Sequence, residues 1–157
     1  MKKNLIAVLV IVQVSLLMAP SKMNAQTMET EFSRAQGYFV RPELYGAVLG
    51  EFGYQINPNF QIALGGGVEL TEGYAIPELV VGARAYATDS KWTAFIDYHL
   101  GLLLYGQVAF QTHRLSVGPS YKNFDFGAGV VYMNVDGVGV WAPCLNIGFN
   151  FRFHKNQ

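Results

Sequence analysis

Apolar and polar residues alternate with a period of two along most of residues 38–153. The clearest run is residues 60–70, where Phe60, Ile62 and Leu64 alternate with small or polar residues. Successive side chains of a β-strand point to opposite faces of the sheet, so this pattern predicts strands with one apolar face. A chain built from such runs is expected to be all-β.

Seven runs show this alternation, and short segments rich in turn-forming residues separate them. The expected turns lie at residues 56–59, 71–73, 88–91, 106–107, 122–123 and 136–137. A closed bacterial barrel has an even number of strands, which predicts an eighth strand within residues 26–40. The run that starts at Tyr38 can also divide near Arg41-Pro42, because proline cannot donate to a strand ladder.

The first 25 residues have the order of a secretory signal peptide. Lys2 and Lys3 precede an uncharged apolar core at residues 5–17, and a more polar stretch ends at Ala25. The alternative, an uncleaved anchor, is disfavoured because this core is short for a spanning helix. The expected organisation is a signal peptide at 1–25, an N-terminal tail or weak first strand at 26–37, a barrel at 38–153 and a C-terminal tail at 154–157.

The composition differs from that of an average soluble domain. Apolar residues make up 51% of the chain and charged residues 14%, against about 25% charged in typical proteins. Beyond the signal peptide no run of 18 apolar residues predicts a spanning helix. Without residues 1–25 the formal charge is −3, so a nucleic-acid partner is not expected. Cys144 is the only cysteine, which excludes an internal disulfide and suits a small packed residue.

The two faces of the alternating runs differ in chemistry. One face carries large apolar residues such as Trp92, Phe126 and Phe151, which suit contact with outer-membrane lipid. The other carries glycines and isolated polar residues, which suit the crowded interior of a narrow barrel. We predict an interior polar network of nine residues: Glu51, Glu69, Glu78, Arg84, Asp97, His99, Arg114, Asp125 and Arg152. Within it, Asp97 and His99 are expected to form a hydrogen-bonded pair rather than a catalytic dyad.

Three segments add a resemblance to a known family. They read GYQINPNF at 53–60 with LGGGV at 64–68, IPELVVGARAY at 76–86, and LNIGFNFRF at 145–153. In this order they resemble a family of small outer-membrane β-barrel proteins of Bacteroidetes-type Gram-negative bacteria. The resemblance implies an eight-stranded barrel that the outer-membrane assembly machinery inserts by reading an aromatic-ended last strand. It implies no activity, since most family members have none assigned.

The residues predict no catalytic, metal or cofactor site. His113 and Ser116 fall on opposite faces of one strand, which argues against an acyl ester hydrolase barrel. Eight strands also leave no open aqueous channel. The expected protein is therefore a monomeric, all-β, eight-stranded up-and-down barrel of the outer membrane, with a structural or interaction role. The alternatives are that lipid-modifying hydrolase and a secreted soluble lipocalin-like carrier of an apolar ligand.

Overall fold

The computed structural model describes residues 32–71, 74–106, 108–135 and 137–153. The expected signal peptide, most of the expected N-terminal tail and the C-terminal tail at 154–157 lie outside these residues. In the described part of the chain, no helix is long and apolar enough to cross a membrane.

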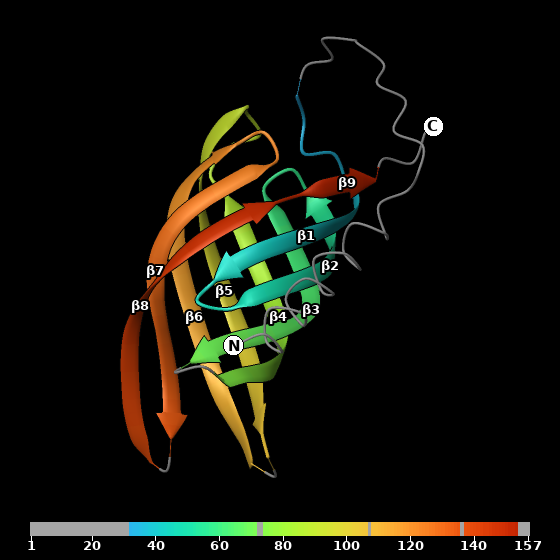
Figure 1. Cartoon of the computed structure of the whole chain (residues 1–157). Coiled ribbons are helices and arrows are strands. Elements are labelled where there is room, and N and C mark those ends of the chain that lie inside the picture. Colours follow the sequence, from blue (N-terminus) through green and yellow to red (C-terminus); the bar gives the residue numbers. More distant parts are fainter. Residues whose placement is uncertain (1–31, 72–73, 107, 136, 154–157) are drawn as a thin grey trace.

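The described chain consists of β-strands joined by short turns (Figure 1). Asn150 alone separates β8 from β9, so these two segments are the halves of one strand and the barrel has eight strands. The segments are β1 (Gly37–Tyr45), β2 (Val48–Asn57), β3 (Phe60–Thr71), β4 (Tyr74–Tyr86), β5 (Trp92–Tyr105), β6 (Val108–Tyr121), β7 (Phe124–Val135), β8 (Val138–Phe149) and β9 (Phe151–Phe153).

The sheet closes on itself. Each strand pairs antiparallel with the next one in sequence, and β1 pairs with β2 on one side and with β8 and β9 on the other. A closed ring leaves no free edge where it is complete, and this is how a β-barrel satisfies its backbone groups. The predicted fold class, an all-β eight-stranded antiparallel barrel, is confirmed.

The position expected for the first strand was wrong. The chain turns at Gly46 and Ala47, not near Arg41-Pro42, and β1 extends to Tyr45. The alternation continues in phase across this two-residue turn, which hides the turn in the sequence. Pro42 lies inside β1, opposite Gly50 of β2. On its other side β1 pairs with β9 up to Val40 and with β8 from Glu43, so Pro42 falls where the last strand is interrupted.

The wall has the two predicted faces. Outward side chains are apolar and exposed, as Leu64 and Val81 are, whereas the inward Arg84 and Asp97 are buried. Inward glycines make room for large neighbours: a Cβ at Gly82 would overlap the His99 ring, and one at Gly101 would overlap Glu78 and Thr112. These glycines are therefore required by close approach inside a narrow barrel.

The barrel is complete over only part of its height. The β1–β2 turn at Gly46 lies well short of the tips of the β5–β6 and β7–β8 hairpins (Figure 1). Pairing of β2 with β3 ends at Val68, and pairing of β1 with β8 ends at Asn146. We call the complete ring the closed section. The strand ends beyond the Gly46 turn form the open extension, which comprises residues 69–71, 74–77, 102–105, 108–111, 132–135 and 138–145.

Candidate functional site

Arg84 of β4 is the centre of the buried network in the closed section. Its Nε donates to Asp97 Oδ1 at 3.0 Å, and its two terminal nitrogens donate to Asp125 and Glu43. Its guanidinium also lies over the Phe95 ring, 4.6 Å from the centroid. One cation thus joins carboxylates from three other strands, β1, β5 and β7, across the lumen.

A second group of residues surrounds His99 on the same level of the barrel. Arg41 Nε donates to Glu51 Oε2 at 2.7 Å and lies 3.5 Å from Glu43 Oε2. His99 Nε2 lies 2.9 Å from Glu51 Oε1. Since Glu43 also contacts Arg84, the two groups form one continuous cluster, the lower cluster. Buried charges are tolerated when they are paired in this way.

A separate cluster, the upper cluster, forms around Arg114 of β6, nearer to the open extension than the lower cluster is. Its terminal nitrogens contact Glu78 and, at 3.0 Å, Glu69 Oε2, and Thr112 Oγ1 donates to Glu78 Oε1 at 2.7 Å. On β4 the inward residues between the two clusters are Val80 and Gly82, and Val80 packs in an apolar layer. The other buried members of that layer are Tyr45, Ala47 and Leu49.

The end of the barrel that holds both described termini is closed by Arg34. Its side chain is buried, with its guanidinium 4.4 Å from the Tyr86 ring centroid. It donates to Ser90 O at 2.8 Å and to Ser120 Oγ at 3.2 Å, and its backbone N–H donates to Asp89 Oδ1 at 2.8 Å. The segment before β1 is thereby tied across this end of the lumen.

The nine predicted network residues all lie on the inner face, but they fall into three places. Glu51, Arg84, Asp97, His99 and Asp125 belong to the lower cluster, and Glu69, Glu78 and Arg114 form the upper cluster. Arg152 is apart from both and contacts Asn123 in the turn before β7.

The expected Asp97–His99 hydrogen bond was wrong. His99 Nδ1 lies 3.7 Å from Asp97 Oδ2, whereas its Nε2 lies closer, at 2.9 Å, to Glu51. Arg41 and Glu43 are buried and point inward, in phase with Glu51, but were not expected in the network, and Arg34 precedes any periodic segment. Only the register across the barrel brings these side chains together.

The charges inside the described barrel nearly cancel. The carboxylates are Glu43, Glu51, Glu69, Glu78, Asp97 and Asp125, and the guanidinium groups belong to Arg34, Arg41, Arg84, Arg114 and Arg152. Ligand atoms of Glu43, Glu51 and His99 lie within 4.8 Å of one another, a spacing that could hold a metal ion. Arg41 contacts both of these carboxylates and Arg84 contacts Glu43, so guanidinium groups already supply positive charge there.

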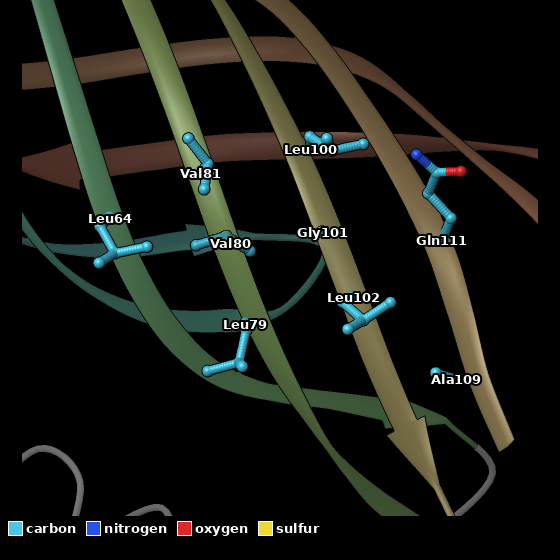
Figure 2. A pocket seen from close by; sticks show the side chains of 9 residues that line it. All are labelled: Leu64, Leu79, Val80, Val81, Leu100, Gly101, Leu102, Ala109 and Gln111. Carbon is cyan, nitrogen blue, oxygen red and sulfur yellow. The ribbon is translucent and has the colours of Figure 1, made fainter.

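The outer wall carries no comparable cluster of charges among the described residues. His113 lies on this wall with its Nδ1 2.7 Å from Tyr98 Oη, whereas Ser116 is buried inside, on the opposite face as the spacing predicted. The wall has shallow apolar hollows instead. One of about 440 Å³ lies between outward leucines of β3, β4 and β5, with Ala109 and Gln111 of β6 at its edge (Figure 2).

A closed ring of eight antiparallel strands, with buried ion pairs inside and an apolar wall outside, defines a barrel of the outer-membrane type. The chain is similar to the N-terminal β-barrel domain of OprF from Pseudomonas aeruginosa, with a TM-score of 0.50 and 17% identity. The match covers 74% of this chain and 100% of that domain, and at this identity it shows the fold alone. Neither the family models nor the curated proteins gave a match. The resemblance to the Bacteroidetes-type family therefore stays a prediction.

Proposed function

We propose that this chain is a small outer-membrane β-barrel protein of the Bacteroidetes type that it resembles in sequence. Its role is structural or interactive, and it acts neither as an open pore nor as an enzyme. The single observation that carries the proposal is the reversed chemistry of the closed section. Charged side chains such as Arg84 and Asp97 are fully buried inside, while large apolar side chains are exposed outside.

The apolar outer wall supports a location in lipid. Exposed apolar residues occur on every strand, as Phe52 on β2, Leu64 on β3, Val117 on β6 and Leu145 on β8 illustrate. Monomeric soluble proteins rarely expose apolar patches beyond a few hundred Å². A soluble carrier of the lipocalin kind would need a polar outer face, so this alternative is disfavoured.

Aromatic pairs on the outer wall support the same location. Trp92 and Tyr121 pack with tilted rings at the end of the barrel that holds the termini, with ring centroids 4.6 Å apart. Tyr132 and Trp141 pack in the same way towards the other end, with ring centroids 4.7 Å apart. Tyr132 pairs with His113, eight residues along β6 from Tyr121, which corresponds to about 20 Å along the axis of a tilted strand. Aromatic girdles flank an apolar band of about 25 Å in such barrels.

The ion-paired interior supports the absence of a pore. Eight strands enclose a space that side chains can fill, and here the lower cluster, the Val80 layer and the upper cluster follow one another along β4.

The proposal also includes a partner. The outer-membrane assembly machinery is proposed to contact the last strand, whose final residues include the aromatic Phe151 and Phe153.

Cell fractionation tests the proposed location. The full chain produced in a Gram-negative host should sediment with the outer membrane and require detergent for extraction. It should also migrate differently on SDS gels with and without boiling, because a folded barrel resists the detergent. Recovery in the soluble periplasmic fraction, with one mobility on gels, would contradict the proposal and favour the soluble carrier.

A further inference from the structure

The first part of β8 departs from the alternation seen in the closed section. Residues 138–145 read VGVWAPCL and are apolar on both faces. Val138, Val140 and Ala142 face inward, as their pairing with inward residues of β7 shows, while Trp141 and Leu145 face outward. A strand that is apolar on both faces is typical of one that has apolar surroundings on both sides.

The described chain does not cover the inner face of this strand. Val138 is 65% exposed and Val140 is 48% exposed, although both point toward the barrel axis. One inward residue of the open extension is charged: Glu69, at its base, is paired with Arg114 of the upper cluster. The other inward neighbours are apolar or aromatic: Ile76, Tyr74, Leu103, Tyr105, Phe110, Val108 and Met133. The open extension is therefore an apolar trough.

The first hairpin forms the floor of this trough. A Cβ at Gly46 would lie 3.3 Å from Val131 Cγ2 and 3.5 Å from Cys144 Cβ, so the β1–β2 turn packs against the inner faces of β7 and β8. Gly46 also lies close to Arg114 Nε of the upper cluster. The trough thus ends on the ion-paired interior and does not continue into it.

The trough opens sideways between β8 and β3. Residues 138–145 have a ladder partner on β7 alone, and residues 69–71 of β3 have one on β4 alone. Val140 lies nine residues from Phe149 in the aromatic end, which is roughly 23 Å along the axis for a strand tilted by about 40°. The gap is therefore continuous with the outer wall. From Leu145 to Val140 it lies within the height of an apolar band of about 25 Å, whereas Val138 lies beyond the Tyr132–Trp141 pair, above that band.

We propose that one acyl chain of a membrane lipid enters the open extension through this gap and lies on the inner face of β8. An acyl chain fits because the trough is apolar, uncharged above its floor and continuous with the lipid-facing wall. Lipid would also explain why residues 138–145 are apolar on both faces. This inference rests on the proposed membrane location.

Tryptophan quenching by brominated lipids tests the proposal. The two native tryptophans are replaced by Trp92→Phe and Trp141→Phe, and single reporters are added in the full chain. Val140→Trp places a reporter in the trough, and Val138→Trp is a second reporter where the side chain is more exposed. Leu145→Trp reports on the outer wall, and Phe95→Trp reports on the closed lumen.

Each variant is folded into phosphatidylcholine vesicles with or without bromine on the acyl chains, and iodide serves as the aqueous quencher. We expect brominated lipid to quench Val140→Trp as strongly as Leu145→Trp, to quench Val138→Trp less strongly because it lies nearer the band's edge, and to leave Phe95→Trp nearly unchanged. Quenching of the trough reporters by iodide instead would overturn the proposal, because it indicates a water-filled trough.

The proposal would also be overturned if neither agent quenched the trough reporters and each particle held two copies of the protein. That result would indicate that a second chain occupies the trough. Failure of the membrane location itself is a distinguishable result. In that case Leu145→Trp would not be quenched by brominated lipid either.

Discussion

The closed section and the open extension are built from the same strands but have different interiors. In the closed section, inward positions on β4 and β5 carry Arg84, Asp97 and His99, and around them buried polar residues alternate with exposed apolar ones. In the open extension, inward positions carry Val138, Val140 and other apolar residues. The difference arises at the Gly46 turn, where β1 and β2 end and the ring is no longer complete.

This contrast shows that a period of two in the sequence indicates that the two faces of a strand have different surroundings. A strand whose two faces have similar surroundings does not show this period. Where apolar residues point outward and charged groups point inward, as around Arg84, the period of two is clear. Where both faces carry apolar residues, as in residues 138–145, the strand remains but its pattern disappears.

Loss of Arg84 should have the largest effect on stability. Arg84→Met removes the cation shared by Glu43, Asp97 and Asp125, and a buried charge left without its partner costs about 3–5 kcal/mol. Urea unfolding in lipid vesicles measures the change. The control is Arg152→Met, which removes an arginine that contacts Asn123 at the end of the barrel and should cost clearly less. Equal losses would show that the lower cluster is not the centre of the interior.

A charge on the outer wall should have the next largest effect. Leu64 is 65% exposed on the outer face of β3, and an arginine near the bilayer midplane costs about 2–4 kcal/mol. Leu64→Arg should therefore reduce the amount of folded barrel seen on unboiled gels, while Leu64→Met should fold as the wild type does. Normal assembly of Leu64→Arg would argue that this wall does not face lipid.

Crowding of the lumen should have a moderate effect. In Gly82→Val the new side chain overlaps the His99 ring, and overpacking of a tightly packed interior typically costs about 1–3 kcal/mol. The neighbouring Ala83→Val points to the outer wall and should change the urea midpoint little. A larger loss for Ala83→Val than for Gly82→Val would reverse the assignment of the two faces on β4.

The two ion clusters should differ in sensitivity. Glu51→Gln lies in the fully buried lower cluster, where it contacts Arg41 and His99, and should cost about 1–3 kcal/mol. Glu69 lies at the rim of the upper cluster, where its side chain is 12% exposed. In Glu69→Gln, Arg114 keeps its contact with Glu78, so the loss of stability should be below about 1 kcal/mol. Similar urea midpoints for the two variants would remove the distinction between the clusters.

Much of the fold could be predicted from the period of two. The bounds of β5 and β6 and the turns at 56–59, 88–91 and 122–123 agree with the structure, because turn-forming residues separate these strands from their neighbours. The turns expected at 71–73, 106–107 and 136–137 lie partly outside the described residues. The turn expected at 136–137 agrees with the start of β8 at Val138, but the first eight residues of this strand show no alternation because they are apolar on both faces.

The partners within the interior could be predicted only in part. The inward orientation of Arg41, Glu43 and Glu51 follows from local periodicity. That Glu51 meets His99, and that Glu43 meets Arg84, depends on register and on distances across the lumen between strands far apart in sequence. A period along one strand contains no information about the opposite wall.

Ion flux through the inserted wild-type barrel tests the central claim most directly. The protein is folded into vesicles loaded with potassium, and insertion is verified in the same sample by the mobility difference between unboiled and boiled protein. Because Arg84 and Arg114 hold paired carboxylates across the lumen, we expect no release of potassium above that of empty vesicles. Sustained release from vesicles that contain folded wild-type barrel would contradict a lumen closed by ion pairs.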